Sequence, residues 1–146
     1  MQGIQVVPDI AHTIQLAVAP VFLLSGVGVT LTVLTNRLGR IVDRARLLEE
    51  RAESAPAASR TALHAQLETL SRRAMLVNRA LTLSTSCALL ICGVIVALFV
   101  GGLLRIDLSG LIALLFVIAM VAFIGALLYF LREIFVSIRT LRFGPE

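Results

Sequence analysis

The chain contains no lysine and no tryptophan, and only two of its 146 residues are cysteines. Cys87 and Cys92 lie within one apolar stretch, at a spacing that fits neither a CxxC redox pair nor a zinc site, so we expect both to be small buried residues. A glycine-rich phosphate loop, the HExxH and GxSxG motifs and clustered carboxylates are also missing. We therefore predict no catalytic residue, no metal site and no cofactor, and a protein that is not an enzyme.

Charged residues are missing from three long apolar stretches, roughly residues 14–35, 80–104 and 111–131. Each stretch exceeds the roughly 20 residues that a helix needs to cross the hydrocarbon layer of a bilayer. The composition agrees, with 58% hydrophobic residues and a mean hydropathy of +0.96. The sequence predicts an all-α integral membrane protein with three transmembrane helices, forming a single membrane domain over residues 1–146. No basic residue precedes Arg37, so we expect the first stretch to remain as a membrane helix and not to be cleaved as a signal peptide.

Between the first two spans, residues 36–79 keep a helical period but become amphipathic. Apolar residues recur there at alternating spacings of three and four, at Leu38, Ile41, Ala45 and Leu48, and again at Leu63, Leu67, Leu70, Ala74 and Val77. Residues 54–59 are rich in serine, alanine and proline and separate the two runs. The pattern predicts an antiparallel helical hairpin of the coiled-coil type.

The arginines indicate how the chain is oriented. All 13 basic residues are arginine: nine lie between Arg37 and Arg79, one is Arg105, and Arg132, Arg139 and Arg142 follow the third span. Because positive residues are retained in the cytoplasm, the N-terminus and the Arg105 loop should face outside, and the hairpin and the C-terminus should be cytoplasmic.

Several arginines of the hairpin share one helix face. Asp43 can pair with Arg40, but Arg37 and Arg44 have no acid three or four residues further along. Something outside the helix should therefore neutralise them, and we predict a lipid- or anion-binding role for Arg37, Arg40, Arg44 and Arg79. Anionic headgroups are the expected partner, a bound anion or an acidic protein is the alternative, and nucleic acid is not expected because these residues border the spans.

Two further groups of polar residues have functional and structural interpretations. Hydroxyl side chains within the spans can line a hydrated path or bridge helices, and those singled out are Ser25, Thr32, Thr85 and Ser86. A polar step at the outer end of the first span, formed by Asp9, His12 and Gln15, could surround a cation or a proton. A helix cap at Asp9 and an interfacial His12 explain the same step.

Small residues recur every four positions in the second span, at Gly93, Ala97 and Gly101. In lipid, helices associate through close backbone approach at such residues. The pattern predicts a face that another helix covers, in a homo-oligomer or, alternatively, by the third span of the same chain.

The stretch from His12 to Arg46 carries a resemblance to a known family. Its most specific parts are IQLA at 14–17, APVFLL at 19–24, and NRL followed by RIVDR between Asn36 and Arg44. It resembles the start of the bacterial family catalogued as domain of unknown function 2721, which consists of small membrane proteins with three predicted spans. The resemblance implies the bacterial cytoplasmic membrane and transfers no catalytic or binding residue.

Two functions remain open at this point. We lean toward a pore or small-solute pathway built from several copies, because three spans are few for a transport route within one chain. The alternative is a structural or regulatory module whose arginine-rich hairpin binds a protein partner or anionic lipid.

Overall fold

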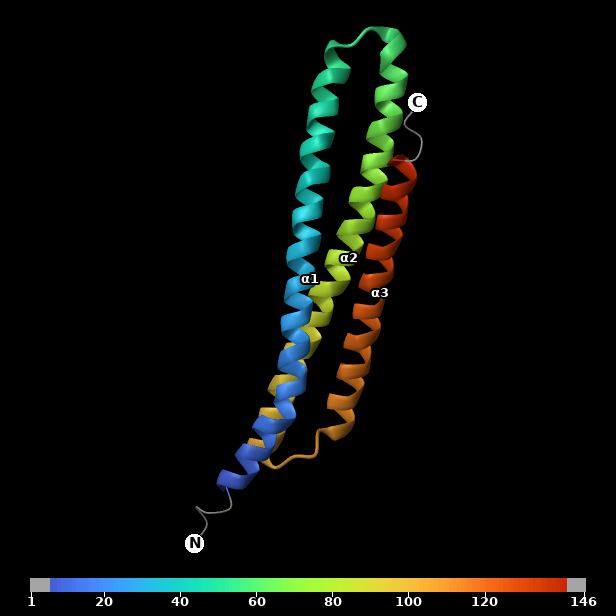
Figure 1. The fold of residues 1–146 in the computed structure, drawn as a ribbon. Helices are drawn as coiled ribbons and strands as arrows, with labels where there is room; N and C mark the ends of the chain where they lie inside the picture. Colours follow the sequence, from blue (N-terminus) through green and yellow to red (C-terminus); the bar gives the residue numbers. More distant parts are fainter. Residues whose placement is uncertain (1–5, 142–146) are drawn as a thin grey trace. The chain divides into compact units, whose positions relative to one another are not determined.

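A computed structural model describes residues 6–141, and Figure 1 shows their three helices. Helix α1 spans Val6–Ser54, α2 spans Ala57–Leu104 and α3 spans Ser109–Leu141, and the described residues contain no strand. The predicted all-α class is therefore confirmed. All three helices are long and apolar enough to cross a membrane, which is consistent with a multi-pass membrane protein. Met1, Arg142 and Glu146, which entered the orientation prediction, lie outside the described residues.

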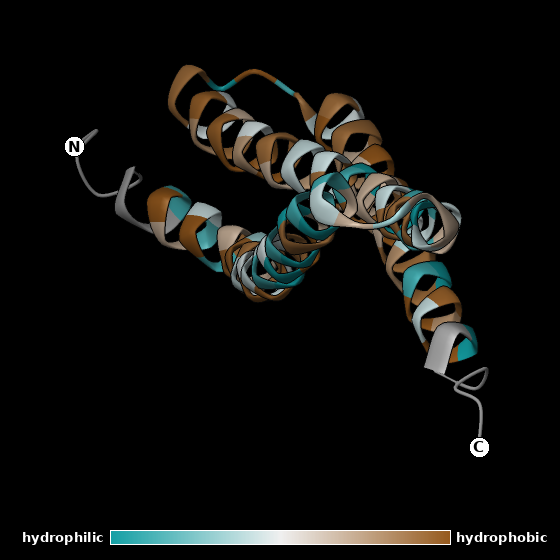
Figure 2. Cartoon of the chain, turned by 90° about the horizontal axis from the view of Figure 1, so that it is seen from above, coloured by the Kyte–Doolittle hydropathy of each residue, from teal (hydrophilic) through white to brown (hydrophobic). Residues whose placement is uncertain are grey.

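The helices are longer than the predicted spans. Each apolar segment of α1 and α2 continues without interruption into a hairpin helix, so hydrophilic and hydrophobic parts belong to the same helix (Figure 2). Only Ala55 and Pro56 separate α1 from α2, a shorter turn than predicted. Helix α1 begins at Val6, so the interpretation of Asp9 as its cap is wrong, and Asp9 lies inside the first turn.

By its internal contacts the chain divides into two compact units, which are described separately. The first unit contains the described residues up to Thr30 together with Leu83–Ile124, and the second contains Leu31–Thr82 and the described residues from Gly125 onward.

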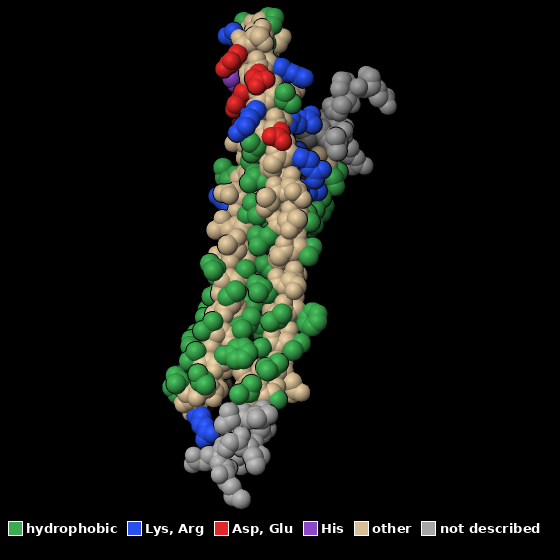
Figure 3. All heavy atoms as spheres, turned by 90° about the vertical axis from the view of Figure 1, so that its left-hand side faces the viewer, with side chains coloured by type: hydrophobic (Ala, Val, Ile, Leu, Met, Phe, Trp, Pro, Cys, Tyr) green, Lys and Arg blue, Asp and Glu red, His purple; other side chains and the backbone are tan. Residues whose placement is uncertain are grey.

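The second unit contains the hairpin, whose two helices pack through an apolar seam. The buried seam residues are Leu34, Ile41, Leu48, Leu70, Val77 and Ala80, and Leu38, Leu63 and Leu67 pack against them. Of the residues that the 3-4 spacing predicts for the seam, Ile41, Leu48 and Leu70 are buried in this core. Tyr129 and Phe130 of α3 pack against the same cluster, so all three helices contribute to this core. In Figure 3 the charged side chains gather on the part of α1 and α2 near their connecting turn.

The first unit contains the short connection from α2 to α3. Arg105 has a φ of 52°, and the Ile106 N–H donates to the Gly101 carbonyl oxygen at 3.1 Å, which together form a left-handed helix end. A Cβ at Gly101 would lie 3.3 Å from the Ile106 carbonyl oxygen, so the turn favours glycine there. The Ser109 N–H donates to the Asp107 carboxylate at 3.0 Å at the start of α3.

The small residues of α2 also lie in the first unit, where the same chain approaches them. Ala97 is buried, and a Cβ at Gly93 would lie 4.0 Å from a methyl group of Leu115 on α3. Ala119 of α3 is fully buried as well. These contacts agree with the intramolecular alternative stated for this face, while association between copies stays a prediction.

Candidate functional site: a buried glutamate between arginines

Glu133 is the only acidic residue of α3 and its side chain has no exposure to solvent. Its neighbours along the helix include Leu131, Ile134 and Phe135, which are apolar. An ionised carboxylate removed from water loses several kcal/mol of hydration unless partners replace the water. The structure must therefore supply opposite charge and hydrogen-bond donors at this position.

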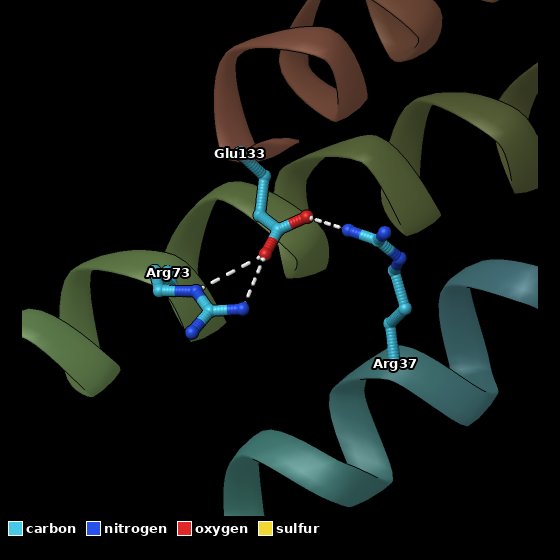
Figure 4. A network of polar contacts seen from close by, with 3 residues as sticks. All are labelled: Arg37, Arg73 and Glu133. Carbon is cyan, nitrogen blue, oxygen red and sulfur yellow. Dashed lines mark hydrogen bonds and ion pairs between the residues drawn. The ribbon is translucent and has the colours of Figure 1, made fainter. Parts of the chain in front are cut away.

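Two arginines from different helices supply them (Figure 4). Arg73 of α2 donates from Nε and Nη2 to Oε1 of Glu133, at 3.1 and 2.9 Å. Arg37 of α1 donates from Nη1 to Oε2. Both carboxylate oxygens are thus engaged by guanidinium groups, and the cluster connects α1, α2 and α3.

Aromatic rings of α3 lie next to two of the arginines. The Arg37 guanidinium carbon lies 5.1 Å from the centroid of the Phe130 ring, and that of Arg79 lies 5.9 Å from the centroid of Tyr129. Both distances are within the range of cation–π attraction. Arg37 therefore meets α3 twice, through a carboxylate and through a ring one helical turn earlier.

The ion-pair cluster borders a basic pocket of about 290 Å³, which we call the arginine cleft. Its lining residues are Arg37, Arg40, Ile41, Arg44, Leu70, Arg73 and Ser137. A second pocket of about 580 Å³ continues from it, sharing Arg44, Leu70, Arg73 and Ser137 and adding Gln66 and Thr69. The other groove of the hairpin is different in charge, because Arg46 lies there with Glu49 and Glu68.

The structure brings together three of the four arginines predicted to bind lipid or anions. Arg37, Arg40 and Arg44 line the arginine cleft, whereas Arg79 lies on Tyr129 and does not line it. Among the described residues, Asp43 does not pair with Arg40, and the ion pairs join Glu133 to Arg37 and Arg73. The partner that Arg37 lacks in its own helix is therefore Glu133 of α3. Among the described residues, Arg44 forms no ion pair.

The hydroxyl residues of the spans are placed on the surface of the single chain. Ser25, Thr32 and Thr85 are exposed and Ser86 is partly exposed. The Ser25 hydroxyl donates to the Val21 carbonyl oxygen of its own helix at 3.2 Å, so its hydrogen bond is satisfied within α1.

The outer polar step is exposed as well, at Asp9, His12 and Gln15. The part of the chain that the structure describes contains no group of His, Cys, Asp and Glu able to hold a metal ion. Cys87 is buried as expected, but Cys92 is exposed. Five residues rotate a helix by about 140°, so the two thiols point to different sides.

Sequence reasoning missed Glu133 and Arg73. A signal was available, because Glu133 is the single acid in the apolar sequence of α3 and Arg37 lacked a neutralising residue in its own helix. An unmatched acid and an unmatched base on two membrane-compatible helices are natural candidates for a pair.

The three membrane-compatible helices are consistent with a small all-helical, multi-pass membrane protein, and the arginine–glutamate cluster joins all three of them. The chain belongs to the family described as Protein of unknown function (DUF2721), whose sequence profile matches residues 17–143. The resemblance found in the sequence is confirmed, and the match includes every residue of the cluster. Neither the curated proteins nor the solved structures contain a match to this chain.

Proposed function

We propose that this chain is a non-enzymatic membrane protein whose arginine cleft binds the phosphate of an anionic phospholipid headgroup at the cytoplasmic face of the bilayer. The observation that carries the proposal is the charge of the cleft. Four arginines line it, and Glu133, which pairs with two of them, offsets a single positive charge. An excess of guanidinium groups around a small pocket favours an anion with several oxygen atoms.

Arg40 and Arg44 are the residues most available to such a ligand. Both are exposed and neither is among the ion-paired residues of the described chain. Arg37 and Arg73 keep exposed fractions of 31% and 20% in their side chains, so their remaining N–H groups can also reach a bound phosphate. Glu133 then holds these two guanidinium groups in place while Arg40 and Arg44 provide uncompensated charge.

A lipid is favoured over a soluble anion by the position of these arginines along the chain. Arg37 and Arg40 directly follow the first apolar stretch, and Glu133 directly follows the third. Such positions fall at headgroup level when the apolar stretches cross the hydrocarbon layer. The arginine bias that predicts a cytoplasmic hairpin also favours a cleft beside the anionic leaflet.

The pore favoured in the sequence analysis becomes the second proposal. A solute pathway would have to be formed by several copies, with Ser25, Thr32 and Thr85 on a shared axis. The bond of the Ser25 hydroxyl to its own helix accounts for that residue without a pathway. Accordingly, we rank the lipid-binding module first.

Native mass spectrometry of the protein released from nanodiscs tests the proposal. Arg40→Gln combined with Arg44→Gln should lower retention of phosphatidylglycerol over phosphatidylcholine by about 30-fold, since each arginine near the surface contributes about 1 kcal/mol. The matched control is Arg46→Gln with Arg51→Gln, which removes the same charge from α1 outside the cleft. Equal losses in the two double variants would show that only total charge matters and would overturn the cleft.

A further inference from the structure

A mainly apolar pocket with two charged residues at its edge lies in the first unit, and it shares no lining residue with the arginine cleft. Its volume is about 500 Å³, and it lies between the first turns of α1 and the C-terminal turns of α2. Its charged lining residues are Asp9 and Arg105, and its apolar walls include Ile10, Phe99 and Leu103. We propose that this pocket binds an ethanolamine-type phospholipid, with the ammonium group on Asp9, the phosphate on Arg105 and an acyl chain along the apolar wall.

The two charges of the pocket are available to a ligand. Asp9 and Arg105 are both exposed, and in the described residues neither forms an ion pair with the other or with a third group. A pocket with one acid and one base matches a ligand that carries both charges, and neither a simple anion nor a simple cation would use both residues. A primary ammonium also has three N–H donors for a carboxylate, whereas a quaternary ammonium such as choline has none.

The apolar wall explains why the ligand is a lipid and not a free headgroup. Ile10, Phe99 and Leu103 are large apolar residues with exposed fractions of 50%, 45% and 82%. They adjoin charged residues at the ends of helices that are apolar enough to cross a bilayer. A phospholipid presents the same order of chemistry, with headgroup charges next to an acyl chain.

Local geometry positions the backbone of each charged residue. Arg105 occupies the left-handed position at the end of α2, which sets the direction in which its side chain leaves the helix. On the facing helix, the Thr13 hydroxyl donates to the Asp9 carbonyl oxygen at 2.9 Å. A Cβ at Gly102 would lie 3.0 Å from the same Thr13 oxygen, so α1 and α2 are close beside the pocket. The acid and the base are therefore held on two helices in contact.

The test measures lipids that remain bound to the full chain in native mass spectrometry, from nanodiscs that contain equal amounts of phosphatidylethanolamine and phosphatidylcholine. The wild type should retain the ethanolamine lipid about tenfold better, since the carboxylate–ammonium contact is a charge-assisted hydrogen bond. Asp9→Asn should abolish this preference. Arg105→Asn should lower retention of both lipids, because asparagine accepts the left-handed conformation but carries no charge for the phosphate.

Control variants separate the pocket from general charge effects. Asp43→Asn and Arg72→Gln change exposed residues that line none of the pockets described above, and both should behave as the wild type. Arg105→Lys should restore retention that Arg105→Asn loses. Equal retention of the two lipids by the wild type, or a preference that survives Asp9→Asn, would overturn the assignment. Displacement of the bound lipid by free phosphoethanolamine at equimolar concentration would show that the acyl chain contributes nothing, and would overturn the lipid as occupant.

Discussion

Replacing Glu133 with glutamine tests the cluster that connects the three helices of the second unit. The amide keeps the size of the side chain and removes its charge. Oε1 accepts two hydrogen bonds from Arg73 and Oε2 accepts one from Arg37, and the side chain of Glu133 is fully buried. After the substitution, two guanidinium groups face a neutral partner whose NH₂ group is itself a donor.

The expected loss of stability follows from this geometry. Removing one partner of a buried ion pair costs about 3–5 kcal/mol, because the other charge stays buried without compensation. Here Arg37 and Arg73 are 31% and 20% exposed, so water can partly replace the carboxylate. We therefore expect a loss near the lower end, about 3 kcal/mol.

The assay is reversible unfolding in mixed micelles, combined with a double-mutant cycle between Glu133→Gln and Arg73→Gln. A coupling energy of about 2 kcal/mol between the two sites is expected for groups in direct contact. Glu49→Gln is the control, since it removes an acid from an exposed position and should change stability by less than about 0.5 kcal/mol. The reasoning is refuted if Glu133→Gln lowers the free energy of unfolding no more than Glu49→Gln does, or if the double-mutant cycle shows no coupling energy.

Three further predictions concern the hairpin, the α2–α3 turn and the orientation. Leu48→Ala should destabilise the chain by about 2–5 kcal/mol, and Leu47→Ala, at the exposed neighbouring position, by much less, as measured by unfolding in micelles. Hydrogen bonds from the Ser109 hydroxyl and backbone N–H hold the pKa of Asp107 below its ordinary value. The stability that these hydrogen bonds contribute is therefore complete at pH values above the ordinary pKa of aspartate. It is lost as the pH falls through the lowered pKa of Asp107 in the folded protein. Melting curves across the acid range should show this loss in the wild type, and it should be absent in Asp107→Asn. Finally, a single cysteine at Ser59 in a chain without Cys87 and Cys92 should resist an impermeant thiol reagent in intact cells, whereas one at Ile106 should react; the reverse pattern would contradict a cytoplasmic hairpin.

The helices and the hairpin seam could be predicted because both follow from periodic patterns in local sequence. Apolar stretches without charge give membrane-compatible helices, and the 3-4 spacing identifies Ile41, Leu48 and Leu70 as seam residues. The end of α2 at Leu104 matches the predicted end of the second span. The left-handed conformation of Arg105 just after it was not predicted, because glycine usually fills such a position. The helix cap interpreted at Asp9 was wrong because α1 begins earlier, at Val6. Pro8 does not prevent this start, since proline is compatible with the first turn of a helix.

The buried cluster could not be predicted from local sequence, because its members are 96 and 60 residues apart along the chain. Hydropathy predicts that the third apolar stretch ends at Leu131 and that Glu133 belongs to a polar tail. In the structure α3 continues to Leu141, and Glu133 turns toward the hairpin. Only the packing of α3 on the hairpin determines that this acid meets Arg37 and Arg73.

Glu133→Gln, which should lower the stability of the protein, should strengthen lipid binding in the arginine cleft. A phosphate that enters the arginine cleft meets Arg37 and Arg73 while Glu133 engages them, so the carboxylate both orients these donors and repels the ligand. Glu133→Gln removes the repulsion and raises the net charge beside the cleft by one unit. We expect phosphatidylglycerol retention to increase by about fivefold, because each charge near the surface contributes about 1 kcal/mol. The stability of the protein should decrease at the same time. Because loss of fold would lower retention, an increase cannot arise from destabilisation, and unchanged or reduced retention in a variant that remains folded would show that the phosphate does not bind beside Glu133.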